Sequence, residues 1–180
     1  AQGCGIFGWG LLYDHTGNDT YFGVDHVQGS SLCGVGILYD REGMDDYQCW
    51  AHSQGYGDIW GLGILNDAGT DPDNFFAEWD AAVGPSFASP QNENINANFV
   101  QGAAFGLRTT SVFPVIWDGG VGILSDEGGG NDFTCGVFGQ GLGFWFSTGV
   151  LSIGDGDNAV DCDWYGIGAG AHYAAGIAIG

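Results

Sequence analysis

Aspartate recurs in this chain at fixed distances from glycine. Residues 14–19 read D-x-x-G-x-D, the pattern returns at residues 40–45, and residues 126–131 repeat it with asparagine at the last place. Carboxylates and turn carbonyls of this kind are the hard oxygen ligands that Ca²⁺ prefers, although the same side chains also cap turns by hydrogen bonding to backbone N–H groups. The candidate calcium ligands are Asp14, Asp19, Asp40, Asp45, Asp67, Asp71, Asp126, Asp132, Asp155 and Asp157.

Other chemical motifs are weaker. Residues 155–163 begin like an EF-hand loop, but they lack the glycine at position six and the glutamate at position twelve that such a loop needs. His26 and His52 stand 26 residues apart, which suits either a metal-binding pair with Asp25 or two members of an aromatic column. No Gly-x-Ser-x-Gly elbow occurs, so the sequence gives little support to nucleophilic catalysis.

A repeated unit fixes where these side chains stand. Gln-Gly pairs begin at Gln2, Gln28, Gln54 and Gln140, and the first three are 26 residues apart. Before the later pairs the chain follows the pattern G-x-G-(I/L)-L-x-D-x-x-G-x-(D/N)-x-(Y/F), and about six further residues lead to the glutamine. Agreement at so many positions indicates an internal repeat.

The unit has the composition of one coil of a parallel β-helix. Its G-x-G-I-L part begins with small residues and turns apolar, which predicts a strand, and its D-x-x-G-x-D part carries turn residues. Stacked coils place equivalent residues in columns about 4.8 Å apart. We therefore predict an all-β fold, a parallel β-helix (β-solenoid) of about 26-residue coils in one domain over residues 1–180. An antiparallel propeller or sandwich is the second choice, although propeller repeats usually reach about 40 residues or more.

The repeat is interrupted in the middle of the chain. A third copy starts at Gly61, and an irregular insertion is predicted at about residues 72–118. Within this insertion, residues 74–83 are expected to form a short helix, Gln101-Gly102 marks a return to the repeat, and residues 107–118 form a further loop. The register resumes at Gly120.

Composition excludes several kinds of partner. The chain has 180 residues, of which 36 are glycine, and its 22 acidic residues are balanced by two arginines and no lysine, for a net charge of −20. Such a charge repels nucleic acid phosphates and anionic lipid, so neither is expected as a partner. No apolar run reaches the length of a membrane span, so no insertion into a membrane is expected. Cations are the expected means of balancing so many carboxylates in a compact fold.

The five cysteines have no zinc-finger spacing. Cys49, Cys135 and Cys162 all lie five residues before the Gln-Gly position of the repeat. Cys135 and Cys162 should therefore be neighbours on adjacent coils, either as a disulfide or as a pair of buried thiols.

The repeat resembles that of a class of uncharacterised bacterial proteins built from G-x-G-x-L-x-D-x-x-G-x-D-x-Y units followed by Q-G, over residues 1–71 and 119–180. Residues 17–21 are also distantly similar to the calcium-binding nonapeptide of RTX proteins, although the period here is 26 rather than nine. The resemblance implies a secreted or surface-displayed protein and carries over no activity.

These features together predict an extracellular or cell-surface structural or binding protein that is stabilised by Ca²⁺ and forms part of a surface or filamentous assembly. Because the chain starts and stops within a repeat, the expected partner is another copy stacked end to end or the rest of a longer parent chain, and glycans are a further class of ligand. The alternative is a carbohydrate-active enzyme, a polysaccharide lyase or hydrolase. In such an enzyme the sugar would stack on Trp50, Trp60 or Trp79. Paired aspartates would act as acid and base, and Arg108 would supply positive charge.

Overall fold

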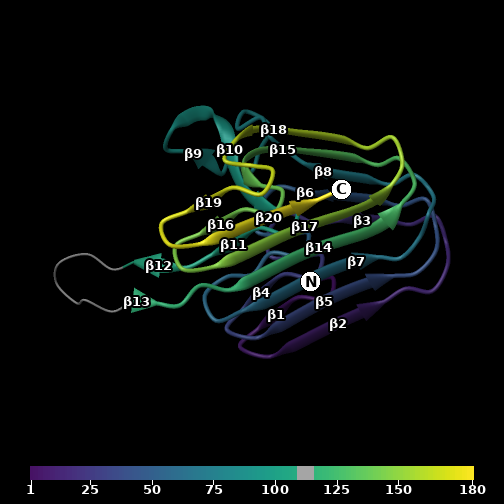
Figure 1. The fold of residues 1–180 in the computed structure, drawn as a ribbon, viewed down its shortest axis with the longest axis horizontal. Helices are drawn as coiled ribbons and strands as arrows, with labels where there is room; N and C mark the ends of the chain where they lie inside the picture. The colour runs from purple at the N-terminus through teal and green to yellow at the C-terminus, as the bar shows by residue number, and fades with distance from the viewer. Residues whose placement is uncertain (109–115) are drawn as a thin grey trace.

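The computed structural model describes residues 1–108 and 116–180. Over these residues the chain contains no helix and winds into a β-solenoid of six coils whose stacked strands are parallel (Figure 1). Register pairs such as Trp9–Val35 and Val35–Leu62 lie 26 or 27 residues apart, so the predicted fold class and period are confirmed. A helix long and apolar enough to cross a membrane is accordingly not found in the described residues.

The coils build three faces, and we number them 1 to 6 by their strand on the first face. The first face is the sheet of β2 (Trp9–Tyr13), β5 (Val35–Asp40), β7 (Leu62–Asp67), β14 (Val121–Gly128), β17 (Thr148–Asp155) and β20 (Ala175–Ile179). The second face contains β3 (Thr20–Phe22), β6 (Asp46–Cys49), β8 (Asn74–Ala77), β15 (Asp132–Gly139) and β18 (Ala159–Trp164). The third face contains the short strands β1 (Gly5–Ile6), β4 (Ser31–Leu32), β11 (Ala104–Phe105), β16 (Gly143–Phe144) and β19 (Gly170–Ala171).

A glycine at the second position of each first-face strand lets the backbone of that strand approach another backbone segment closely. A Cβ atom on Gly36 would lie 1.9 Å from the carbonyl oxygen of Ser30, and one on Gly63 would lie 2.0 Å from that of Tyr56. Only glycine fits at such distances. The leucines two positions further on point inward and form the core, and they are Leu38, Leu65, Leu124 and Leu151.

The Gln-Gly pairs form the corner between the second and third faces. Gln28 and Gly29 both have positive φ, at 52° and 75°. The buried Gln28 Nε2 donates to the carbonyl oxygen of Tyr21 at 2.7 Å and, one coil further on, to that of Gln48 at 3.0 Å. The glutamine therefore ties successive coils together, which explains why it recurs in the repeat.

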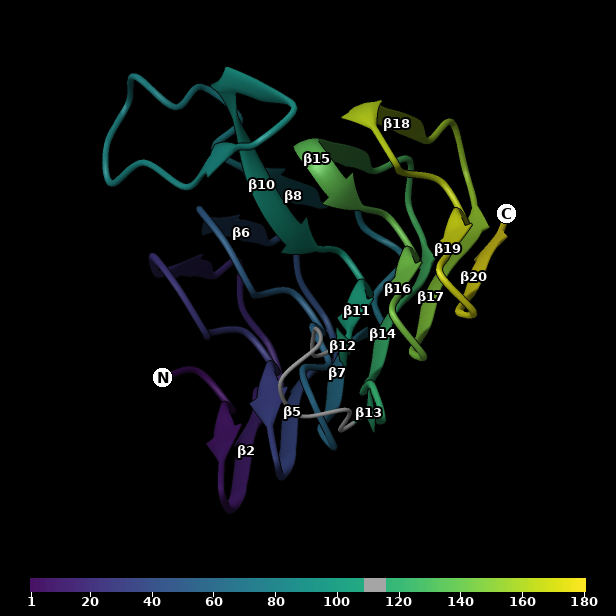
Figure 2. The same ribbon diagram turned by 90° about the vertical axis from the view of Figure 1, so that its left-hand side faces the viewer.

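Two excursions interrupt the stack (Figure 2). Residues 78–96 leave the second face after β8 and include β9 (Ala88–Ser89), which pairs antiparallel with the first part of β10 (Asn92–Val100). The second part of β10 pairs parallel with β15 and so rejoins the solenoid. The other excursion is a hairpin whose strands are β12 (Leu107–Arg108) and β13 (Ile116–Trp117). The insertion predicted at residues 72–118 therefore includes two segments that belong to the stack, β8 and residues 97–105.

The helix expected at residues 74–83 is wrong. Residues 74–77 form β8 instead, and the ring of Phe75 stacks between those of Tyr47 and Phe133, with centroids 4.7 Å away on both sides. Packing within the aromatic column outweighs local helix propensity here.

Candidate metal centre at the aspartate corner

The turn between the first and second faces gathers several of the predicted calcium ligands, and we call it the aspartate corner. Two columns of side chains line it, one at the end of the first-face strands and one just before the second-face strands. The first column contains Asp14, Asp40, Asp67 and Asp126, and the second contains Asp19, Asp45, Asp73, Asn131 and Asn158. The aspartates of coils 2 to 4 in both columns are almost completely buried.

Backbone hydrogen bonds account for one oxygen of each second-column side chain from Asp45 onward. The N–H groups of Asp19, Asp45 and Asp73 each donate at 2.7 Å to the side-chain oxygen one coil further on, of Asp45, Asp73 and Asn131 respectively. Asparagine accepts such a bond as well as aspartate does. Capping of a turn by these side chains is found in the first column, where Asp67 and Asp126 accept the N–H groups of Gly69 and Gly128, whereas the second-column bonds link neighbouring coils.

The second oxygen is where the coils differ. In coil 4, Asn131 Nδ2 donates to Asp126 Oδ1 at 2.7 Å, so an amide faces a carboxylate. In coils 2 and 3 an aspartate stands in place of that asparagine, and the Oδ2 atoms of Asp45 and Asp73 are buried without a hydrogen-bond partner in the described part of the chain. Carboxyl groups therefore stand where coil 4 has an amide paired with a carboxylate, and a proton or a cation would satisfy these oxygens.

Tyrosine hydroxyls donate hydrogen bonds to two aspartates of the first column. Tyr47 Oη donates to Asp67 Oδ2 at 2.8 Å, and Tyr21 makes the equivalent bond to Asp40. The next ring in this column is Phe75, which has no hydroxyl. In coil 4 the Asn131 amide donates to Asp126 Oδ1, and Asp126 Oδ2 is buried without a hydrogen-bond partner in the described residues. The tyrosines therefore compensate in coils 2 and 3 for only one of the two facing carboxyl groups.

Burial makes these carboxyl groups hard to ionise. It raises the pKa of Asp73 to about 8, that of Asp126 to about 7 and that of Asp45 to about 6, and the charges of neighbouring aspartates add to the effect. The pKa values of Asp40 and Asp67 are raised, again chiefly by burial. At neutral pH the corner must therefore hold protons or take up positive charge from elsewhere.

Among the side chains that the structure describes, positive charge lies outside this corner. Arg41 follows the first-face strand of coil 2, but its guanidinium lies 3.4 Å from Glu42 Oε1 and 2.9 Å from His15 Nε2 at the surface. Among the described residues, the ion pairs are formed by Arg41, His26 and His52 and do not include a corner aspartate. The corner is therefore anionic whenever its carboxyl groups ionise.

Three of the corner residues form a donor set for a metal ion. One carboxylate oxygen from each of Asp45, Asp67 and Asp73 lies within 4.8 Å of the other two, and all three residues are buried. Anionic oxygens suit Ca²⁺, which takes about six to eight oxygen ligands. The set fits such an ion, because the ion would satisfy the Oδ2 atoms of Asp45 and Asp73 that protein donors leave unpaired in the described residues. Backbone carbonyls or water must complete the shell.

The structure gathers some of the predicted ligands and separates others. Asp40, Asp45, Asp67 and Asp126 lie in the buried corner, Asp14 and Asp19 lie half-buried at its coil 1 end, and Asp71, Asp132, Asp155 and Asp157 are exposed. Sequence spacing misses Asp73. The turn of coil 3 is one residue longer, with six positions from Asp67 to Asp73 against five from Asp40 to Asp45. The sequence pattern, counted two residues on from Gly69, pointed to Asp71 instead.

Comparisons with known proteins yield no relative. No family model, no curated protein and no solved structure matches this chain. The function therefore has to be argued from the geometry of the chain itself.

Proposed function

We propose that this chain is a structural β-solenoid that is stabilised by Ca²⁺ at the aspartate corner and serves as a building unit of an extracellular surface or filamentous assembly. The observation that carries the proposal is the pair of buried oxygens, Asp45 Oδ2 and Asp73 Oδ2, that have no donor in the described part of the chain. A buried carboxylate without a partner is strongly destabilising. An ion that binds both oxygens therefore stabilises the folded stack directly.

An extracellular setting supports the choice of calcium. Calcium sites of extracellular modules work with dissociation constants of about 10⁻⁴ to 10⁻³ M. A donor set of three carboxylates, from Asp45, Asp67 and Asp73, can therefore be filled outside the cell without high affinity. Each bound ion also offsets part of the net charge of −20, which otherwise opposes a compact fold.

The two end coils support the assembly part of the proposal. Trp9 in coil 1 is 90% exposed, and Ile179 in coil 6 is 58% exposed. Gly10 and Gly176 occupy the same repeat position, so β2 of a second copy can continue the first face beyond β20 in register. Unpaired strand edges of this kind are templates for a further strand. We expect a second copy, stacked end to end, to cover them.

Unfolding and mass measurements in calcium and in chelator test the proposal. Calcium should raise the unfolding temperature by mass action, and light scattering should give multiples of the chain mass as the protein concentration rises. Asp157→Asn removes an exposed carboxyl group and should leave the calcium response intact. An unfolding temperature that is equal in calcium and in chelator contradicts the calcium centre, and a mass that stays monomeric at high concentration contradicts the assembly.

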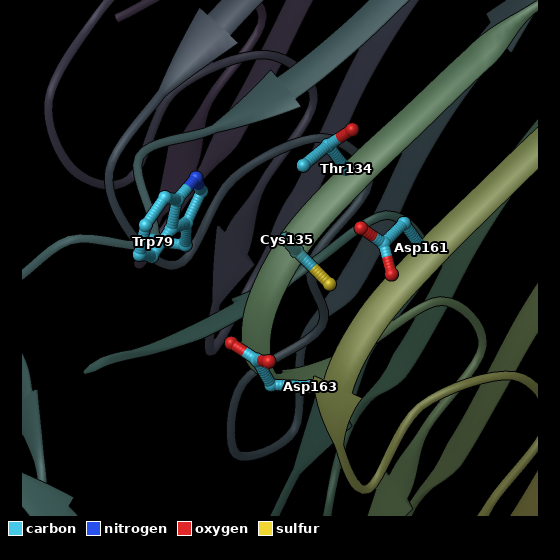
Figure 3. A pocket seen from close by; sticks show the side chains of 5 residues that line it. All are labelled: Trp79, Thr134, Cys135, Asp161 and Asp163. Atoms are coloured by element: carbon cyan, nitrogen blue, oxygen red, sulfur yellow. The ribbon is translucent and has the colours of Figure 1, made fainter.

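A second candidate, a carbohydrate-active enzyme, is favoured by one cavity beside the second face. Its volume is about 220 Å³, and it is lined by Trp79, Thr134, Cys135, Asp161 and Asp163 (Figure 3). Asp161 and Asp163 are two residues apart on β18, so both project from the same side of the strand. An aromatic ring beside two carboxylates is a combination that glycoside hydrolysis uses.

A glycan panel distinguishes this candidate from the structural role. Glycan turnover by the parent protein would favour the enzyme if Asp163→Asn abolishes it and Asp132→Asn on β15 leaves it unchanged. If the unmodified protein neither binds nor cleaves any glycan of the panel, this candidate is removed. The side chain of Arg108, the basic residue expected to contribute to such a site, lies outside the described residues.

A further inference from the structure

The far end of the second face holds another group of metal-binding side chains, which we call the histidine site. It consists of Asp25, His26 and His52 and lies next to the Gln-Gly corner. The two histidines belong to a column of rings that continues through Phe99, Phe138 and Tyr165. The expected stacking of His26 and His52 on adjacent coils is thereby confirmed, with ring centroids 5.0 Å apart.

Both histidines direct the same nitrogen toward the same oxygen. His26 Nδ1 lies 3.0 Å from Asp25 Oδ1, and His52 Nδ1 lies 2.8 Å from it. Donor atoms of the three residues all lie within 4.8 Å of one another. Tetrahedral Zn²⁺ has bonds of about 2.0–2.1 Å and therefore holds its ligands about 3.3 Å apart. A widening of the two contacts by a few tenths of an ångström makes room for the ion.

Ring stacking alone does not account for this group. The same column is filled by Phe138 in coil 4 and Tyr165 in coil 5, which stack well as simple aromatic rings. The position of Asp25 is occupied by Ala51 in coil 2 and by Val137 in coil 4. An aspartate therefore occurs beside the column at the end where the rings are imidazoles, and not beside the phenylalanine of coil 4.

A second carboxylate lies near His26, just beyond hydrogen-bond distance. The second ring nitrogen of His26, Nε2, lies 3.9 Å from Asp58 Oδ2. A carboxylate at the far nitrogen of a metal-bound histidine orients the ring and makes it a better ligand. His26 and His52 are half-buried and Asp25 is exposed, so an ion can enter from solvent and keep a water molecule as a further ligand.

We propose that the histidine site binds one divalent ion of the Zn²⁺ class through Nδ1 of His26, Nδ1 of His52 and a carboxylate oxygen of Asp25, with water at the fourth position. Imidazole nitrogen with one carboxylate suits zinc, whereas the all-oxygen set of the aspartate corner suits calcium. The protein therefore has two centres with different ions, and the zinc site does not depend on the calcium proposal.

Calorimetric titration of chelator-stripped protein with Zn²⁺, with Ca²⁺ present throughout, tests the site. One zinc ion per chain should bind saturably. His52→Phe should lower the affinity by about tenfold or more, because it removes a ligand. The substitution copies the phenylalanine of later coils, so the ring column should persist, and an unfolding temperature unchanged in chelator checks this. His15→Ala removes a histidine outside the site and should bind zinc like the parent protein.

A second variant and a second ion keep the test decisive. Asp25→Asn, at an exposed position, should also weaken zinc binding, and Co²⁺ should give the visible absorption of a tetrahedral site in the parent protein but not in this variant. Saturable zinc binding that survives both His52→Phe and Asp25→Asn overturns the proposal. So does the absence of saturable binding in the parent protein, or zinc binding that only Asp73→Asn abolishes, which would assign the ion to the aspartate corner.

Discussion

Replacing Asp73 by asparagine converts coil 3 of the aspartate corner into a copy of coil 4. The new side chain keeps the oxygen that accepts the N–H group of Asp45 at 2.7 Å, just as Asn131 accepts that of Asp73. Its amide nitrogen replaces the unpaired Oδ2 and can donate to Asp67, as Asn131 donates to Asp126. We expect Asp73→Asn to stabilise the calcium-free protein and to remove most of its response to calcium.

The magnitude follows from the pKa of Asp73. Burial raises this pKa to about 8 from an ordinary value of 3.8, so at pH 7 the folded protein keeps a proton that the unfolded chain has released. Each pH unit above the unfolded pKa costs about 1.4 kcal/mol, which gives a penalty of about 4 kcal/mol at pH 7. Asparagine carries no such penalty. The calcium-free variant should therefore gain up to about 4 kcal/mol, or roughly 10 °C in unfolding temperature.

The assay is thermal and urea unfolding of the parent protein and the variant at pH 7, each in calcium and in chelator. The parent protein should gain stability from calcium, and the variant should not. Asp132→Asn, at an exposed position on β15, controls for the loss of one negative charge and should behave like the parent protein. A calcium-free variant that is less stable than the parent protein refutes the reasoning, as does a variant with the full calcium response.

The stability of the calcium-free protein should fall as the pH rises from about 4 to about 8. The corner carboxyl groups with pKa values of about 6 to 8 keep protons in the folded state that the unfolded chain has released. Urea unfolding across this pH range checks the prediction, and stability that rises with pH contradicts it. Tyr47→Phe should cost about 1–2 kcal/mol in the same assay, because it removes the donor to Asp67, and an unchanged stability would show that this bond contributes nothing. Gly63→Ala should lower the free energy of unfolding by about 3 kcal/mol or more, since its Cβ would lie 2.0 Å from a carbonyl oxygen. Gly8→Ala should be tolerated, because its Cβ would lie 3.7 Å from the nearest carbonyl oxygen. Circular dichroism melts of the two variants distinguish these outcomes.

The columns of the solenoid could be predicted from the sequence because each coil repeats the same steric requirement. Glycine recurs where Gly36 and Gly63 let the backbone of one face touch that of another, and glutamine recurs where Gln28 bridges two coils. Cys135 and Cys162, placed on adjacent coils by spacing alone, are indeed a register pair. Such requirements act on every coil and therefore leave a period in the sequence.

Features that depend on a departure from the period could not be predicted in this way. Counting two residues on from Gly69 pointed to Asp71, but the turn of coil 3 is one residue longer than that of coil 2, so the corner aspartate is Asp73. The excursion at residues 78–96 hides the fact that Phe99 continues the ring column begun by the histidines. Residues 74–77 were expected to lie in a short helix and form β8 instead, because the neighbouring rings around Phe75 decide their conformation.

The chemistry of the aspartate corner also could not be predicted from the sequence alone. The sequence gives the same role to Asp45 and Asn131, because both cap the same turn. Only the three-dimensional arrangement reveals that the asparagine amide is paired with a carboxylate in coil 4, while the corresponding oxygen of Asp45 is buried and unpaired within the described residues. A pattern that permits either residue cannot distinguish a hydrogen bond from an ion site.

Terbium luminescence measures occupancy of the aspartate corner most directly. Tb³⁺ occupies oxygen-rich calcium sites and emits when a nearby aromatic ring is excited, and Tyr47 lies at the corner, with its hydroxyl 2.8 Å from Asp67 Oδ2. We predict sensitised emission from the parent protein that calcium displaces and that Asp73→Asn abolishes. A parent protein that gives no such emission, or emission that persists unchanged in Asp73→Asn, would contradict a cation centre among these buried aspartates.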